Sequence, residues 1–333
     1  MSIRLGYKAS AEQFAPRELL DFAVLAEHVG LDSVAVSDHF QPWRHKTGHA
    51  PNSLVWLGAL AQATERVNML TSVLTPTMRY HPSIVAQSFG TLGCLAPGRV
   101  ILGVGTGEAM NETPATAAEW PGAKERRLRM AEAIELIRRL WTEERVSFDG
   151  EYYKTDKATI YDKPEQQVPI YVAASGPLAA KLAGRAGDGF ICTSGKKPEL
   201  YEELLGNVRE GAAAAGKDAD GIERTIEIKV SYDRDADYAL HACEWWAALA
   251  LTPDEKSGIE DPIEMERLAD EHADRAHTRF IVTSDPAEAA EKIWWYVDQG
   301  FEHLVFHGPG GDQRRFLEQF SADVLPLLRS RAG

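Results

Sequence analysis

Eight short apolar runs recur along the chain, and a longer amphipathic stretch separates most of them from the next. Such runs are typical of buried strands, and the stretches between them have helical periodicity. Eight strands alternating with helices predict an α/β fold, the (β/α)8 TIM barrel, because eight parallel strands close the sheet and remove its edges. A doubly wound open sheet is the alternative. The runs lie at residues 3–9, 33–38, 67–74, 100–105, 169–174, 189–193, 225–232 and 303–307.

Prolines indicate where several of the helices between these strands begin. Pro16, Pro82, Pro177 and Pro286 each stand just before an amphipathic stretch. Proline suits the first turn of a helix because the N–H that it lacks would have no helical partner there. We therefore expect a helix to start at each of these four residues.

Two long segments, at about 106–168 and 233–283, follow the carboxyl ends of strands. The first contains a predicted helix near 124–140 and a hairpin over 146–153 that turns at Asp149 and Gly150. The second is charged and helix-forming, with no clear strand. Insertions at this end of a barrel form walls and lids over an active site. With no repeat or linker, we expect residues 1–333 to form a single barrel domain.

Charge and composition exclude several classes of partner. The formal net charge of −14 opposes binding to nucleic acid or to an anionic membrane surface. Three separated cysteines show no metal-ligand spacing, so we expect no metal site. No apolar run approaches the roughly 20 residues that cross a bilayer, and the polar N-terminus does not resemble a targeting segment. We therefore expect a cytoplasmic protein.

Polar side chains cluster where the predicted strands end. A parallel barrel brings these ends to one mouth, so the residues should converge there. A helix start with free backbone N–H groups, as after Ser175 and Gly176, can bind a phosphate. The residues at strand ends are Asp38, His39, Trp43, Ser72, Val73, Thr75, Glu108, Asn111, Ser175, Gly176, Thr193 and Lys196, and the second long segment adds Lys256 and Arg279.

Each of these features has a structural explanation when it is taken alone. An Asp beside a His is often only a hydrogen-bonded pair, and adjacent lysines usually lie in solvent. The glycines of Gly103 to Gly107 lack the spacing of a dinucleotide-binding loop. A base, an acid, glycine turns and cations at several strand ends together indicate an active site.

Six segments, spread from the first strand to the final helix, carry a more specific pattern: 6–14, 37–45, 71–77, 103–108, 187–196 and 312–318. They resemble the deazaflavin-dependent glucose-6-phosphate dehydrogenases, a family of luciferase-like barrels that use coenzyme F420. The resemblance implies an oxidoreductase that moves a hydride from C1 of a hexose 6-phosphate, foremost glucose 6-phosphate, to F420. The product would be the lactone, and the family also suggests a homodimer.

The same resemblance implies a role for each site residue. His39 would take the proton of the C1 hydroxyl, Glu108 would protonate N1 of the reduced cofactor, and Trp43 would pack over the sugar. Two groups are needed because hydride transfer leaves one proton to remove and one to add. Ser72 and Val73 would be joined by a non-prolyl cis peptide bond. Cofactor contacts would include Asp38, Ser72, Val73, Thr75, Glu108, Asn111, Ser175 and Gly176, and Thr193, Lys196, Lys256 and Arg279 would hold the substrate phosphate.

The sequence departs from the family pattern at three places. Ser175 stands where a glycine is expected in the turn that binds the cofactor phosphate. Ser257 stands where a histidine is expected, and residues 271–277 are shortened and recomposed; these two departures lie in the wall around the sugar phosphate and concern the choice of sugar more than the type of reaction. Fructose or mannose 6-phosphate therefore remain open as substrates. Another F420- or FMN-dependent luciferase-like oxidoreductase is the alternative enzyme, and a non-catalytic deazaflavin carrier is the alternative from another class. The phosphate-binding cations argue against a monooxygenase, and the acid and base argue against a carrier.

Overall fold

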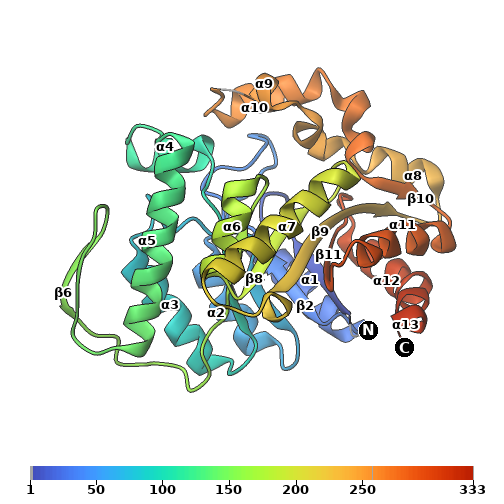
Figure 1. Cartoon of the computed structure of the whole chain (residues 1–333). Helices are drawn as coiled ribbons and strands as arrows, with labels where there is room; N and C mark the ends of the chain where they lie inside the picture. Colours follow the sequence, from blue (N-terminus) through green and yellow to red (C-terminus); the bar gives the residue numbers. More distant parts are fainter. Residues whose placement is uncertain (1–2, 257, 333) are drawn as a thin grey trace.

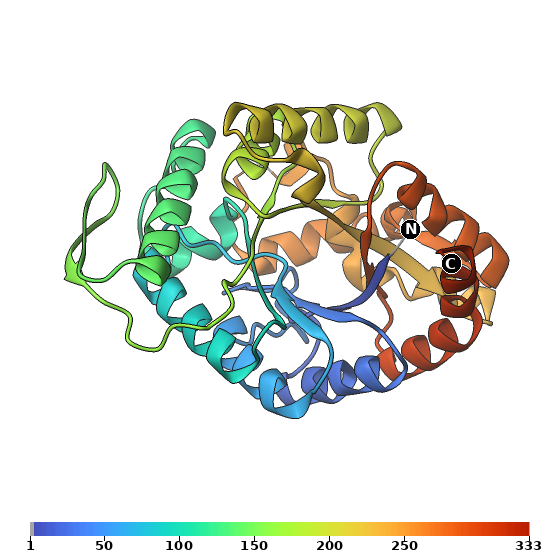
Figure 2. The same ribbon diagram turned by 60° about the horizontal axis from the view of Figure 1, so that its bottom comes forward.

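The computed structural model describes residues 3–256 and 258–332, and it forms a closed parallel barrel (Figures 1 and 2). Strand β9 pairs with both β11 and β8, which closes the sheet. The predicted barrel is confirmed, and the open-sheet alternative is wrong. In order around the barrel the strands are β1 (Arg4–Ala9), β2 (Ser33–Val36), β3 (Asn68–Thr71), β4 (Val100–Val104), β7 (Ile170–Ala173), β8 (Gly189–Thr193), β9 (Glu223–Tyr232) and β11 (His303–His307).

Helices cover the outside of the barrel, as Figure 2 shows. Four of them begin at Pro16, Pro82, Pro177 and Pro286, so the helix starts predicted from proline are confirmed. The outer helices are α1 (Pro16–His28), α2 (Ser53–Ala63), α3 (Pro82–Leu95), α5 (Ala123–Thr142), α6 (Pro177–Ala186), α7 (Pro198–Ala214), α11 (Pro286–Asp298), α12 (Gln313–Asp323) and α13 (Leu325–Ala332), and a short 3-10 turn η1 (Ala219–Gly221) precedes β9.

The interior of the barrel is arranged in layers. An apolar layer of Ala35, Leu70, Ile101, Tyr171, Ile191 and Val305 fills the middle. On the amino-terminal side, buried His303 contacts Glu223 at 3.0 Å and the Ser33 hydroxyl at 2.7 Å. On the carboxyl-terminal side, Glu227 lies between two lysines. The apolar layer therefore separates two polar layers, and only the layer on the carboxyl-terminal side borders the catalytic face of a barrel of this kind.

The first long segment folds as α4 (Ala109–Thr116), α5, and a hairpin of β5 (Val146–Asp149) and β6 (Lys154–Ala158) that projects from the molecule (Figure 1). The predicted helix and hairpin are confirmed. The expected turn at Asp149 and Gly150 is wrong, because Asp149 still pairs with Lys154. The turn spans residues 150–153, and the second strand lies beyond the predicted end of the hairpin.

The second long segment contains α8 (Ala236–His241), η2 (Glu244–Ala250), α9 (Pro253–Lys256), α10 (Pro262–Asp270) and η3 (Ala273–Arg279). The expectation that it holds no strand is wrong, because Ile281–Thr283 forms β10 and pairs with Val230 to Tyr232 at the end of β9. A strand of three residues is too short to produce a periodic pattern in the sequence, so it could not be predicted. It forms because the long β9 beside it offers a partner.

Close packing inside the barrel gives one prediction about stability. A Cβ atom at Gly103 would lie 1.9 Å from the Thr71 carbonyl oxygen, whereas a Cβ at Gly58 in α2 would meet nothing within 4 Å. We expect Gly103→Ala to lower the free energy of unfolding by about 1 to 3 kcal/mol or more, as overpacking does. Gly58→Ala is the control and should be neutral or stabilising. Urea unfolding of both variants tests this, and equal stabilities would contradict it.

Candidate functional site

The carboxyl ends of the barrel strands surround a cavity of about 350 Å³. Most of the residues predicted from strand ends lie on its wall. Further lining comes from the turn after β4 and from Glu227 of β9. The predicted residues that line the cavity are Asp38, His39, Ser72, Val73, Thr75, Glu108, Asn111, Ser175, Thr193 and Lys196.

The four remaining predicted residues lie beside this cavity. The Trp43 ring is 5.8 Å from the His39 ring, centroid to centroid, and the Lys256 ammonium lies 4.9 Å from the Trp43 centroid. Arg279 donates to the carbonyl of Gly195 at 3.4 Å, next to Lys196. Gly176 follows Ser175 and precedes the first turn of α6. The structure therefore brings the predicted set to one face, whereas Ser257 lies outside the described residues.

His39 is held by a carboxylate that the sequence analysis did not assign. Nε2 of His39 lies 3.4 Å from Oε1 of Glu12, and the other oxygen of Glu12 accepts a hydrogen bond from the Ser37 hydroxyl at 2.6 Å. Burial would raise the pKa of Glu12, but His39 and Lys8 outweigh burial and lower it. The ionised Glu12 favours a proton on Nε2, which leaves the lone pair on Nδ1. Nδ1 is buried and has no hydrogen-bond partner among the described residues.

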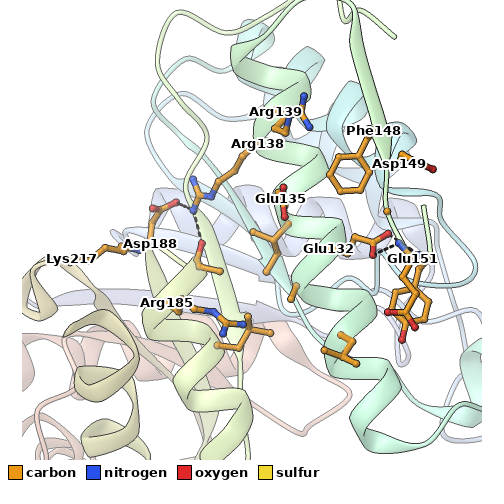
Figure 3. A pocket seen from close by; sticks show the side chains of 17 residues that line it. Glu132, Glu135, Arg138, Arg139, Phe148, Asp149, Glu151, Arg185, Asp188 and Lys217 are labelled. Atoms are coloured by element: carbon orange, nitrogen blue, oxygen red, sulfur yellow. Dashed lines mark hydrogen bonds and ion pairs between the residues drawn. The ribbon is translucent and has the colours of Figure 1, made fainter. Parts of the chain in front are cut away.

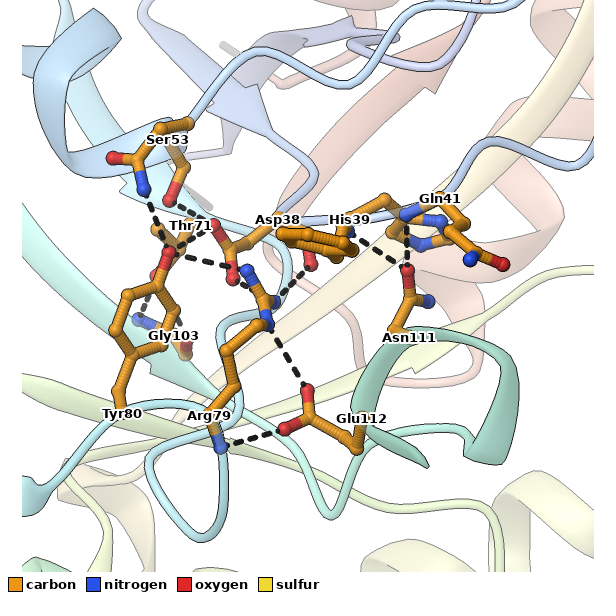
Figure 4. A network of polar contacts seen from close by, with 12 residues as sticks. Asp38, His39, Gln41, Ser53, Thr71, Arg79, Tyr80, Gly103, Asn111 and Glu112 are labelled. Carbon is orange, nitrogen blue, oxygen red and sulfur yellow. Dashed lines mark hydrogen bonds and ion pairs between the residues drawn. The ribbon is translucent and has the colours of Figure 1, made fainter. Parts of the chain in front are cut away.

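Asp38, which lines the cavity, is the centre of a polar network (Figure 4). Its carboxylate accepts from Arg79 at 2.7 Å, from the Ser53 hydroxyl at 2.7 Å and from the Tyr80 hydroxyl at 3.3 Å. Arg79 also lies 3.5 Å from Glu112. The network joins the loop after β2 to α2, to α4 and to the segment before α3, and it fixes the loop that carries His39. Asp38 contributes to the cavity wall with its carboxylate already satisfied.

The start of α4 places an acid at the cavity. Asn111 accepts from the backbone N–H groups of Phe40 and Gln41 at 2.9 and 3.1 Å, which ties α4 to the loop after β2 (Figure 4). Glu108 is the N-cap residue of α4, yet its side chain caps no backbone group. The exposed Glu108 carboxyl group is therefore available to a ligand in the cavity.

Glycines and a cis peptide bond shape the wall between β3 and β4. The peptide bond between Ser72 and Val73 is cis, as expected from the family resemblance. A Cβ atom at Gly105 would lie 2.4 Å from Val73, and Gly107 has a φ of +77° beside Thr75. Side chains at the two glycines would clash with these neighbours, so the turn requires glycine there.

The loop after β8 carries Thr193 and Lys196, and two tyrosines hold it. The Tyr201 hydroxyl accepts from the Lys196 N–H and donates to the Thr193 carbonyl, both at 3.1 Å. The Tyr296 hydroxyl accepts from the Gly195 N–H at 3.3 Å. These contacts fix the loop, and because Arg279 donates to the carbonyl of Gly195, Lys196 and Arg279 lie on the same side of the cavity. Sequence spacing could not show this, because Tyr201 and Tyr296 come from helices on the outside.

Cations gather at this wall. Burial lowers the pKa of Lys256, Glu108 opposes that effect, and the nearby cations Arg279 and Lys229 lower the pKa further. An anion bound here would offset the repulsion among the cations and would raise the pKa of Lys256 again. The wall is therefore suited to an anionic group such as a phosphate.

A buried ion-pair cluster forms the floor of the cavity. Glu227 lies 3.2 Å from Lys8 and 3.3 Å from Lys229, and Lys8 also donates to the carbonyl of Ser72 at 2.6 Å. Burial would raise the pKa of Glu227, but the two lysines outweigh burial and hold it well below 4.5. This cluster was not predicted from the sequence, although Glu227 and Lys229 are charged residues two apart in an apolar run. That pattern was the available signal.

The cavity fits a flat cofactor with a phosphate-bearing arm. The glycine turn and the Ser72–Val73 peptide give it a backbone wall that a ring can approach closely. The N-terminus of α6 has no side-chain cap, so its first N–H groups can bind an anion. His39 lines the cavity, and its buried Nδ1 has no hydrogen-bond partner among the described residues. No group of three or more His, Cys, Asp and Glu side chains within residues 3–256 and 258–332 could hold a metal ion.

A larger hollow of about 940 Å³ lies elsewhere, between α5, the hairpin and α6 (Figure 3). Its charged groups are largely paired: Arg138 contacts Asp188 at 2.8 Å, and Glu132 accepts from the N–H groups of Tyr152 and Tyr153. These contacts join the outer helices and the hairpin. None of the predicted site residues lines this hollow, so size alone does not identify the functional site.

Comparison with known proteins identifies the family. A family model described as luciferase-like monooxygenase matches residues 1–303, so the chain belongs to the luciferase-like monooxygenase family. The chain is 61% identical over 331 residues to the F420-dependent glucose-6-phosphate dehydrogenase of Intrasporangium calvum, with 98% of this chain and 99% of that one covered. It is 59% identical over 333 residues to the enzyme of the same name from Mycolicibacterium smegmatis, with 99% of each covered.

A solved structure supports the same relationship. It is an F420-dependent secondary alcohol dehydrogenase in complex with an F420-acetone adduct. It matches with a TM-score of 0.92 and 37% sequence identity, covering 99% of this chain and 100% of that one. The fold is therefore shared with an enzyme whose solved complex contains an F420-acetone adduct.

The low pKa of Glu227 predicts how stability depends on pH. A group whose pKa is lowered on folding stabilises the protein above its unfolded pKa, and this stabilisation is lost as the pH falls through the folded value. Below pH 4.5 the wild type should therefore lose free energy of unfolding more steeply than Glu227→Gln, by up to about 1.4 kcal/mol per pH unit. Urea unfolding from pH 6 downward measures both slopes. Parallel curves would show that Glu227 is not held ionised.

Proposed function

We propose that this protein is an F420-dependent dehydrogenase that oxidises a hexose 6-phosphate, foremost glucose 6-phosphate, to its lactone. The observation that carries the proposal is one cavity with the His39–Glu12 pair on one side and Lys196, with Arg279 beside it, on another. Dehydrogenation of an alcohol needs a base at the oxygen, and recognition of a phosphate needs cations at a distance from it. The relatives' names describe the same reaction.

In this proposal His39 removes the proton of the C1 hydroxyl at Nδ1. Glu12 keeps the imidazole in the required tautomer and stabilises the imidazolium that forms. Bound F420 would supply the hydride acceptor for C1. Trp43 packs over the sugar beside His39, where its ring face favours the cationic imidazole.

Glu108 supplies the second proton transfer, at N1 of the cofactor. Its side chain is exposed at the cavity and is not used to cap α4. Thr193, Lys196, Lys256 and Arg279 hold the substrate phosphate. The cofactor is held by Asp38, Ser72, Val73, Thr75, Glu108, Asn111, Ser175 and Gly176, with its phosphate at the N-terminus of α6.

Three further inferences come from the family resemblance and the sequence. We infer that the whole chain is a single barrel domain, that it assembles as a homodimer and that it acts in the cytoplasm. Within the described residues, no helix is both long enough and apolar enough to cross a membrane. Size-exclusion chromatography with light scattering tests the dimer.

The direct test of the function mixes the purified protein with oxidised F420 and a panel of sugar phosphates. Loss of the cofactor's visible absorbance with glucose 6-phosphate is the expected result. Fructose and mannose 6-phosphate test the breadth of substrates, and FMN or NADP in place of F420 is the control. Reduction of F420 by a secondary alcohol but by no sugar phosphate would favour the alternative luciferase-like oxidoreductase.

His39→Ala should lower kcat by about 100-fold to 10,000-fold, the usual contribution of a positioned base. Binding of F420, followed by fluorescence titration, should change little because other residues hold the cofactor. His45→Ala is a matched control on the same loop. Turnover near that of the wild type at saturating substrate would show that His39 is structural.

Replacing Lys196 or Arg279 with Ala should raise KM for glucose 6-phosphate by about 10-fold to 150-fold per cation, with a smaller effect on kcat. The phosphate lies away from C1, so its binding energy is shared by the ground and transition states. Lys197→Ala, which removes a neighbouring charge, is the control. If both variants keep the wild-type KM, these cations do not bind the substrate phosphate.

A further inference from the structure

The proposed function gives no role to Glu227, although its carboxylate lines the cavity. Glu227 is on the inner face of β9, where side chains two apart face the same way, and its side chain is 12% exposed. A buried carboxylate that reaches a substrate cavity costs desolvation energy, which its partners must offset. It is therefore a candidate for contact with the ligand.

The partners of Glu227 hold its carboxylate in one orientation and leave it able to accept further hydrogen bonds. Lys8 contacts Oε2 at 3.2 Å, and Lys229 contacts Oε1 at 3.3 Å. Nδ1 of His307 lies 3.7 Å from Oε1, beyond hydrogen-bond distance. An ionised carboxylate can accept about four hydrogen bonds and donates none. Any further partner from the cavity must be a donor, such as a sugar hydroxyl.

The position of Glu227 relates it to both ends of the proposed substrate. On the side of the phosphate, Thr193 of β8 is the direct neighbour of Glu227 in the sheet. On the side of the base, Lys8 contacts Glu227 and also lowers the pKa of Glu12, the partner of His39. A sugar with C1 at His39 and its phosphate near Thr193 therefore passes over the Glu227 carboxylate.

We propose that Glu227 determines which hexose 6-phosphate the site prefers, by accepting a hydrogen bond from the hydroxyl group on C2. The proposal rests on the proposed function, which places C1 at His39. Of the two ring atoms bonded to C1, the ring oxygen has no proton to donate, whereas C2 carries a hydroxyl group. A site built around a substrate hydroxyl rejects the analogue that lacks it, because the buried acceptor loses its partner.

The test compares glucose 6-phosphate with two analogues. 2-Deoxyglucose 6-phosphate lacks the C2 hydroxyl, and mannose 6-phosphate carries it in the inverted configuration. Binding to the full-length protein is measured by calorimetry without cofactor, and kcat/KM is measured with F420. The wild type should prefer glucose 6-phosphate over the 2-deoxy sugar by about 10-fold or more, as a hydrogen bond to a charged group does. In Glu227→Met this preference should fall to near one.

Glu223→Met is the matched control, because Glu223 is on the same strand but on the amino-terminal side of the apolar layer. It should retain the wild-type preference. If Glu227→Met does not fold, the double variant Glu227→Met/Lys229→Met removes a cation together with the carboxylate and gives the same readout. The 3-deoxy sugar phosphate is a further probe for the neighbouring hydroxyl.

Each outcome decides the inference separately from the function. A wild-type preference near one, or a preference that survives the loss of Glu227, would overturn it. A preference that depends on the C3 hydroxyl instead would overturn the assignment to C2. If the wild type discriminates in binding but oxidises none of the sugar phosphates, the proposed function fails and the role of Glu227 stands.

Discussion

The carboxyl-terminal half of the barrel depends on the ion pairs that Glu227 forms with Lys8 and Lys229. They connect β1, β9 and, through the carbonyl of Ser72, the end of β3. Removing one partner of a buried ion pair typically costs about 3 to 5 kcal/mol, because the other charge is left uncompensated. The cluster therefore holds these three strands together at the floor of the cavity. The apolar layer beneath it separates the cavity from the amino-terminal end of the barrel.

The barrel and the second long segment contribute different residues to the site. The ends of the barrel strands, the loops after them and the start of α4 carry the proposed base, acid and cofactor contacts. The second long segment, which differs most from the family pattern in the sequence, contributes Lys256 and Arg279. Barrel enzymes commonly vary substrate through their loops while the strands keep the chemistry. On this view the reaction type is set by β2 and β4, and the substrate is set by β9 and the second long segment.

The sequence predicts the barrel well, because each strand is a separate apolar run and four helices begin at proline. It does not predict β10, whose three residues pair only because β9 extends beyond the barrel. The strand-end residues are predictable from the barrel geometry, which brings them to one mouth. Glu12, Arg79 and Tyr201 are not, because they act through contacts between elements distant in sequence. Glu227 and Lys229 were visible as charges in a buried strand, and their pairing needed the register of the sheet.

In the proposed reaction a hydride passes directly from C1 of the sugar phosphate to F420, while His39 takes the hydroxyl proton. Glucose 6-phosphate deuterated at C1 tests this transfer, with mass spectrometry of the reduced cofactor after a single turnover in ordinary water. Direct transfer should give one deuterium in the reduced cofactor and a lactone product without it. Reduced cofactor free of deuterium, or deuterium released to the solvent, would contradict direct transfer.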